Sequence, residues 1–272
     1  GDGFGGSRPR TPAAPGRPRR DACRLARLNP HVSLTDVLLV SRVDDLVLVQ
    51  GMHDTRMALR AWSARPWPVL WPWLVLSLIT ACALLLAVYL VATQTTPDPT
   101  FVSIAGVTHP PDLADYLSIL YRNGLVLALH GMACVAGFIA GSSLPLSAAN
   151  RSGIDRWVHE KAGPFAIAFV ICATAFSLGT QALGIGMLAS DVSAQLGIGP
   201  GTLVLGLLPH ALPELTALFL PLGAWLVASR RGDWNQLLAA TFVTVGLAIP
   251  VLLAAAAVEL WVTPDLLRAL AG

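Results

Sequence analysis

The residues best suited to chemistry in this sequence are a histidine and a glutamate in a strongly apolar run. His210 and Glu214 stand four positions apart, which places both on one face of a helix. An imidazole beside a carboxylate could relay protons, bind an ion or contact a partner. Because ionisable groups are costly inside a membrane, their presence there suggests a functional site. Pro209 and Pro213 flank the pair, and each removes a backbone hydrogen bond, so we expect the helix to kink or break there.

Four further polar side chains lie in apolar stretches of the chain. Asn123 and His130 share one stretch, and Gln181 lies in the next. Glu259 is within about a turn of the end of the last stretch. Because placing such groups in hydrocarbon is costly, they complete the candidate intramembrane polar site.

Two interpretations of this polar set remain open. In the functional one, His210, Glu214 and Glu259 converge in the outer half of the membrane as a proton relay, an ion site or a partner-binding cluster. In the structural one, the two carboxylates accept hydrogen bonds from helix ends or from His210 and fix the packing of the bundle. A histidine and two carboxylates make a poor metal cage, so we expect no metal and no cofactor.

Small residues form a second pattern, in which Ala133, Gly137 and Gly141 recur at every fourth position. This spacing gives a smooth helix face that another backbone can approach closely. We expect the face to pack against another span of the same chain. Dimerisation across it is the alternative.

The composition shows what kind of element must position these residues. Of the 272 residues, 54% are hydrophobic and 12% are charged, and the mean hydropathy is +0.64. Soluble domains carry about 25% charged residues, so a conventional soluble enzyme is excluded. The net charge of +2 is too balanced for a nucleic-acid binder. The chain is therefore expected to be a polytopic membrane protein.

The apolar runs predict an all-α membrane helix bundle of five spans, since each run can cross about 30 Å of hydrocarbon. A count of six would split the fourth run, which contains several prolines. The five expected spans cover residues 70–92, 118–140, 165–189, 202–228 and 237–262.

The region before the first span divides into two parts, and the helix bundle covers residues 67–272. Residues 1–30 are rich in Arg, Pro and Gly and are expected to form a disordered cytoplasmic arm. Residues 31–66 alternate apolar and charged positions, as in helices that lie on a membrane face, with Gly51 as the candidate break. A small soluble hairpin of helices, or a strand, is the alternative for this part.

Basic residues predict the orientation, because cytoplasmic loops are enriched in Lys and Arg. All 18 of them except Arg122 and Arg268 precede the first span or lie in the second and fourth loops. The N-terminus is therefore expected in the cytoplasm and the C-terminus outside, with an odd number of crossings. The excess of Arg over Lys and the abundant Ala indicate a GC-rich bacterial genome, and we expect the protein in the bacterial cytoplasmic membrane.

With these residues established, the C-terminal half resembles the stage II sporulation protein M family of bacterial integral membrane proteins, over about residues 118–264. Where the family pattern has glycine after the histidine this chain has Ala211, and the expected Asn-Gly near the third span appears only as Gln181 with Gly184. The matching residues are Pro209-His210 with Glu214-Leu215 and Ala217, Glu259 with Val262-Thr263-Pro264, and Asn123 with Gly137 and Gly141.

The resemblance implies a membrane scaffold or a transport-like component, because the family has no established enzymatic activity. Its namesake acts in forespore engulfment, where it is held to anchor a complex that remodels peptidoglycan. Relatives are often encoded beside a MoxR-type AAA+ ATPase, and the resemblance implies such an ATPase as a partner.

Three functions compete. The leading hypothesis is a non-enzymatic membrane scaffold or subunit of a bacterial envelope complex, which recruits partner proteins through its basic arm and its spans. The alternative is a permease or channel subunit, an exporter-like dimer with a separate ATPase, because discontinuous helices often build transport sites. An intramembrane enzyme with His210 and Glu214 as acid and base lacks a credible nucleophile. The expected partners are membrane lipids, other membrane proteins and a second copy, and not nucleic acid.

Overall fold

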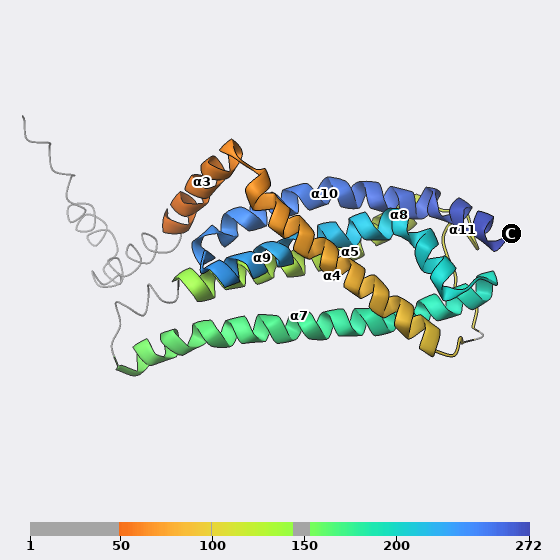
Figure 1. Cartoon of the computed structure of the whole chain (residues 1–272), viewed down its shortest axis with the longest axis horizontal. Helices are drawn as coiled ribbons and strands as arrows, with labels where there is room; N and C mark the ends of the chain where they lie inside the picture. Colours follow the sequence, from red (N-terminus) through yellow and green to blue (C-terminus); the bar gives the residue numbers. More distant parts are fainter. Residues whose placement is uncertain (1–48, 99, 144–152) are drawn as a thin grey trace, which may run out of the picture. The chain divides into compact units, whose positions relative to one another are not determined.

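Helices are the only regular elements in the part of the chain that the computed structural model describes, residues 49–98, 100–143 and 153–272 (Figure 1). Five of them are long and apolar enough to cross a membrane, which confirms the all-α class and the number of spans. The predicted arm at 1–30 and residues 31–48 lie outside the described residues. The spanning helices are α4 (Trp67–Gln94), α5 (Leu113–Phe138), α7 (Gly153–Leu196), α8 (Pro200–Leu218) and α10 (Leu237–Trp261).

The described residues form five further, shorter helices: α3 (Val49–Ala64), η2 (Ile139–Ser143), α9 (Leu220–Arg231), η3 (Trp234–Gln236) and α11 (Thr263–Ala271). The first, α3, falls in the region expected to hold an interfacial helix. The expected break at Gly51 is wrong, because α3 runs through this residue. A Cβ atom there would lie 3.1 Å from the ring of Phe138, so the glycine serves close packing instead.

The fourth apolar run is two helices, and the break lies elsewhere than predicted. The helix α8 continues through Pro209 and Pro213, and the chain leaves it at Phe219, just before Pro221. Each of the two earlier prolines removes a single backbone bond, and α8 packs along both α4 and α10, which support the helix at those points. The predicted break at Pro209 and Pro213 is therefore wrong by about two turns.

The true break is held by side chains from two neighbouring helices. The Ser77 hydroxyl of α4 hydrogen-bonds to the Phe219 carbonyl at 3.0 Å, and also to the carbonyl of Trp73 at 2.7 Å. The Cys134 thiol of α5 donates to the Pro221 carbonyl at 3.1 Å. The Phe219 carbonyl also accepts from the Gly223 amide at 2.9 Å, so the side-chain bonds do not replace a missing backbone bond but tie the break to α4 and α5.

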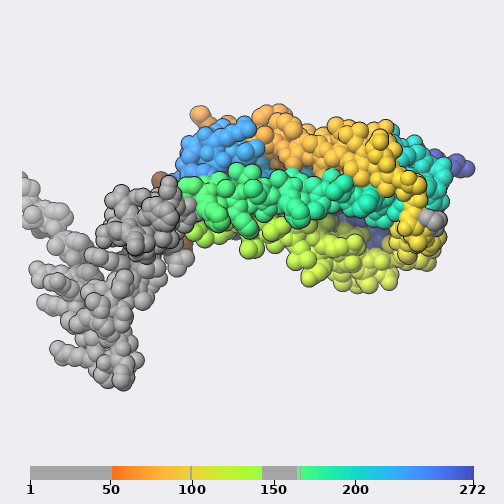
Figure 2. All heavy atoms as spheres, turned by 90° about the horizontal axis from the view of Figure 1, so that it is seen from below, coloured from red at the N-terminus to blue at the C-terminus, as the bar shows by residue number. Residues whose placement is uncertain are grey.

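The α8–α9 run forms the centre of the bundle. It packs against α4 on one side and α10 on another, and α10 in turn packs against α5. The helix α4 crosses this group obliquely (Figure 1). The helix α7 meets the others mainly through α4, and Figure 2 shows it along one face, with α4 on one side of it and α5 on the other.

The closest backbone approach in the bundle gives a first prediction. A Cβ atom at Gly223 would lie 2.7 Å from the Trp73 carbonyl oxygen and 2.8 Å from the Ser77 hydroxyl. We therefore expect Gly223→Ala to lower the free energy of unfolding by about 1–3 kcal/mol, the usual cost of overpacking. The thermal unfolding midpoint in detergent measures it.

Gly246→Ala is the matched control, because nothing lies within 4 Å of a Cβ atom at this helical position. Equal midpoints for the two alanine variants would show that α4 and α9 do not approach each other as described.

Candidate functional site

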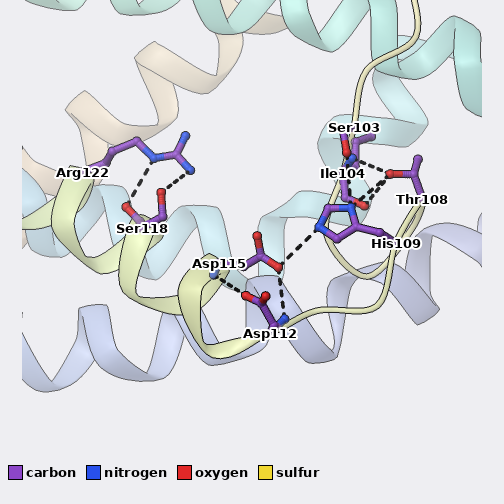
Figure 3. A network of polar contacts seen from close by, with 8 residues as sticks. All are labelled: Ser103, Ile104, Thr108, His109, Asp112, Asp115, Ser118 and Arg122. Atoms are coloured by element: carbon purple, nitrogen blue, oxygen red, sulfur yellow. Dashed lines mark hydrogen bonds and ion pairs between the residues drawn. The ribbon is translucent and has the colours of Figure 1, made fainter.

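The segment between α4 and α5 folds into an ordered turn near the C-terminal ends of α7 and α10. The backbone amide of Gly106 donates to the His109 carbonyl at 2.8 Å. The Thr108 hydroxyl accepts from the amide of Ile104 at 2.8 Å and donates to the carbonyl of the same residue at 3.1 Å (Figure 3). The turn is therefore closed by its own polar groups.

The last turns of α7 hold the same segment in place. The Gln195 side chain both accepts from the Val102 amide at 2.9 Å and donates to its carbonyl at 3.0 Å. The Asp191 carboxylate accepts from the Asp98 amide at 2.7 Å. These three bonds join the segment to the C-terminal end of the third span.

The short helix α11 fixes the other side of the turn. Gly106 has a φ of +78°, and a Cβ atom there would overlap the ring of Pro264, so both its conformation and its surroundings require glycine. Arg268 of α11 donates to the Gly106 carbonyl and pairs with Asp265. No sequence pattern indicates α11, because the last apolar run ends with the fifth span.

A cavity of about 420 Å³ lies below this turn, between α5, α7, α8, α10 and α11. Its volume falls in the range of ligand sites. Figure 2 shows a hollow between α5 and the C-terminal half of α7, with the dark blue of the C-terminal helices behind it. The polar residues in the cavity wall are Ser103, His109, Asp115, Arg122, His210, Glu259 and Thr263.

The first turns of α5 carry the charged groups on one side of the cavity. Asp112 and Asp115 form a capping box in which each carboxylate accepts from the other residue's amide, at 2.8 and 3.1 Å. The His109 ring is 3.4 Å from the Asp115 carboxylate. Two turns further on, Arg122 hydrogen-bonds to Ser118 at 3.4 Å (Figure 3).

Glu259 comes to the cavity from α10, and Arg122 is close enough to interact electrostatically with it. Of the predicted site residues, Glu259 and His210 are therefore brought to one cavity. In the sequence, Arg122 stands out only as a basic residue outside the cytoplasmic loops, and its place beside a buried acid was missed. The spacing of Asp112 and Asp115 before an apolar run is a recognisable capping signal that could have indicated this end of α5.

His210 is held by a threonine and not by a carboxylate. Its Nδ1 lies 2.8 Å from the Thr263 hydroxyl, which donates its own proton to the Val258 carbonyl at 3.1 Å. The Thr263 hydroxyl therefore links the imidazole of α8 to the backbone at the end of α10. The side chain is 7% exposed. The expected bond from His210 to a glutamate is not formed.

Glu214 lies one turn further along α8, close to Asn123 of α5 and near enough to Glu259 for the two carboxylates to interact. The buried atoms Asn123 Nδ2 and Glu214 Oε2 have no hydrogen-bond partner among the described residues. A buried polar atom without a partner is costly, so this pair is unlike the fully satisfied packing contact that the structural interpretation requires.

No family model, curated protein or solved structure matches the chain. The chemistry of the site therefore rests on its own residues.

Of the six predicted polar residues only His210 and Glu259 line the cavity, and two of the other four also lie apart from Glu214 and Asn123. His130 is two turns further along α5, edge-on to the Phe219 ring with a centroid separation of 5.5 Å. Gln181 donates to Ser177 of its own helix at 3.0 Å. They do not join the cluster of Asn123 and the two glutamates.

The predicted small-residue face of α5 is covered within the chain. A Cβ atom at Gly137 would lie 2.7 Å from the indole nitrogen of Trp225, and one at Gly141 would overlap the ring of Trp234. We expected Ala133 and the two glycines to pack inside the chain. The two glycines do pack in this way. The partners are tryptophan rings of α9 and η3, so the two glycines are closed to a second copy.

The cavity combines one guanidinium, two carboxylates and two imidazoles. In the described part of the chain, no three His, Cys, Asp or Glu side chains converge as metal ligands do. One serine of the cavity wall does lie beside an imidazole and a carboxylate: the Ser103 hydroxyl is 3.3 Å from His109 Nδ1, and His109 Nε2 is 3.4 Å from the Asp115 carboxylate (Figure 3).

Proposed function

We propose that this multi-pass membrane protein is a non-enzymatic subunit of a bacterial envelope complex, which recruits partner proteins inside and beside the membrane. The observation that carries the proposal is the loose packing of α7. Only 11% of its apolar window is buried in the bundle, against 22–39% for the other four spans. Because so little of α7 is buried within its own chain, much of its surface is free to contact other chains.

The exposed surface of α7 supports this role. Ala168, Cys172, Ala175 and Gly179 follow one another at intervals of four, three and four residues, and all of them are exposed. A Cβ atom at Gly179 would meet nothing within 4 Å. In hydrocarbon, helices associate where small residues let two backbones approach.

The length of α7 supports the same role outside the bilayer. Its 44 residues span about 66 Å at 1.5 Å per residue, more than the roughly 45 Å of a bilayer with its headgroups. The N-terminal part of α7 contains Asp155, Arg156, Glu160 and Lys161, charged residues that are costly in hydrocarbon, so we expect this part to extend beyond it. In the orientation expected from the basic residues, this extension lies in the cytoplasm, where an ATPase partner could reach it.

The resemblance to the stage II sporulation protein M family adds to the proposal. It implies the same kind of role, a membrane anchor for a complex, and it suggests a MoxR-type AAA+ ATPase as the cytoplasmic partner. The cytoplasmic membrane and the N-terminus-inside orientation belong to the same proposal.

The test is purification of the tagged chain from native membranes in mild detergent, with quantitative mass spectrometry of what accompanies it. We expect membrane or envelope proteins to co-purify and Gly179→Leu to reduce them by about tenfold, as loss of a close helix contact would. Gly246→Leu is the matched control, on another span and also in open surroundings. Recovery of the chain alone, or equal losses in both variants, would contradict the proposal.

A permease or channel subunit is the second candidate, favoured by one observation. The pair Asn123 and Glu214 is buried and unsatisfied next to a polar cavity, as a transported ion or proton would require. Proteoliposomes that show no flux of protons or cations, with or without the ATPase, would remove this candidate.

A further inference from the structure

An aromatic pair marks the depth of the cavity in the membrane. The rings of Tyr116 and Trp261 lie 5.5 Å apart, and Trp261 is 49% exposed. Tyr116 is in the first turn of α5 and Trp261 is the last residue of α10, and both helices supply charged residues to the cavity. Tyr and Trp gather where hydrocarbon meets the lipid headgroups. The charged side of the cavity is therefore at headgroup level.

The cavity wall divides into a polar and an apolar part. The polar part consists of the charged and imidazole side chains from α5, α8, α10 and the turn before α5. Apolar residues come from every element around the cavity. The larger apolar residues that α7 and α8 contribute are Ile185, Leu188, Val192, Leu203 and Leu207. A molecule that fills both parts must be amphipathic.

The charges in the polar part select the headgroup. Arg122 is the one guanidinium, and carboxylates stand to two sides of it, Asp115 on its own helix and Glu259 on α10. Seven residues separate Asp115 from Arg122, about 10 Å along the helix axis. A purely anionic headgroup would be repelled by the carboxylates of Asp115 and Glu259, and a purely cationic one would be repelled by Arg122. A zwitterion satisfies both signs.

We propose that this cavity binds a phospholipid with a primary ammonium group, such as phosphatidylethanolamine. The phosphate accepts hydrogen bonds from Arg122, and the ammonium donates to Asp115 and Glu259. A primary ammonium has three donors, whereas the quaternary ammonium of choline has none to offer a carboxylate. One acyl chain lies on the apolar wall of α7 and α8, because the cavity itself is too small for a whole lipid with two chains.

The experiment is native mass spectrometry of the full chain in detergent, with an equimolar mixture of phosphatidylethanolamine, phosphatidylglycerol and phosphatidylcholine of matched chains. We expect the ethanolamine lipid to be retained at least about tenfold over each of the others, since hydrogen bonds to charged groups are worth that factor. Equal retention of the three lipids by the unaltered chain would overturn the proposal, whatever the variants do.

Variants locate the site. Arg122→Gln and Glu259→Gln are each expected to abolish the preference, while Arg122→Lys keeps part of it because the charge remains. Arg230→Gln, at an exposed position at the other end of the bundle, is the matched control and should keep it in full. A preference that survives both Arg122→Gln and Glu259→Gln would place the lipid elsewhere and overturn the proposal.

Competition with soluble glycerophosphoethanolamine tests whether the occupant is a lipid or a soluble zwitterion with the same headgroup. In competition at the same concentration we expect it to displace little of the ethanolamine lipid, because it lacks the chain that contacts α7 and α8. If the soluble compound displaced the lipid as completely as an excess of the lipid itself does, the occupant would be a soluble molecule and the proposal of a bound lipid would be wrong.

Discussion

Phe219→Ala is expected to lower the free energy of unfolding by about 3–5 kcal/mol, more than any other single substitution proposed for this chain. Phe219 is 0% exposed, its ring packs edge-on to His130, and its carbonyl accepts the hydrogen bond of Ser77. It stands at the break between α8 and α9. Truncation opens a void where α4, α5 and the α8–α9 run meet, and no neighbouring side chain replaces the packing of the ring. The thermal unfolding midpoint in detergent measures the loss.

Phe242→Ala is the control for that variant. Phe242 is 72% exposed on α10, so the same truncation removes surface that faces outward and opens no internal void. We expect its midpoint to stay close to that of the unaltered chain. Similar losses for the two phenylalanines would mean that Phe219 is not in the centre of the bundle.

Glu214→Ala is expected to lower the folded yield strongly, by the equivalent of about 2 kcal/mol, since removal of a mostly buried side chain opens a void between α5, α8 and α10. Glu214→Gln preserves the volume and the capacity to hydrogen-bond with the Asn123 amide, so its yield should stay near that of the unaltered chain. The fraction that elutes as a single species on size exclusion in detergent measures the yield.

Arg230→Ala provides the comparison, because Arg230 is exposed in the last turn of α9. It should change the yield little. If Glu214→Ala and Arg230→Ala behaved alike, the buried acid would have no special place in the bundle.

The number of membrane-spanning helices can be predicted from the apolar runs of the sequence. The apolar runs are long, and their length against the thickness of hydrocarbon decides how many helices can cross. The approach of Glu214 to Glu259 was anticipated only as one of two interpretations, in which the polar residues converge in the outer half of the membrane. The spacing of Gly137 and Gly141 predicted a closely packed face, but it left open whether the same chain or a second copy covers it.

The errors have local physical causes. Proline predicts a helix break at 209 and 213, but within a bundle neighbouring helices support a helix through an isolated proline. The actual break before Pro221 is tied to α4 by Ser77, which lies 142 residues away from Phe219 in the sequence. No local pattern predicts a contact of that kind.

The cavity was missed for a similar reason. It needs the turn at residues 101–109, the last turns of α7 and the helix α11 to come together, and each of these carries an ordinary local sequence. His210 shows the limit most clearly. Its spacing from Glu214 suggests a pair, yet Thr263, beyond the end of the fifth span, takes its Nδ1. A spacing of four gives a shared helix face but not the partner across the interface.

The most direct test of the five-span topology is the side of the membrane on which each end of the chain lies. One chain keeps Cys23 as its single cysteine, with Cys82, Cys134 and Cys172 changed to alanine, and another lacks all four and carries Ala271→Cys. Five crossings with the N-terminus inside predict that a membrane-impermeant maleimide labels Ala271→Cys in intact cells and labels Cys23 only after lysis. Labelling of both positions from the same side would contradict the odd number of crossings, and with it the placement of the polar cavity at the outer surface.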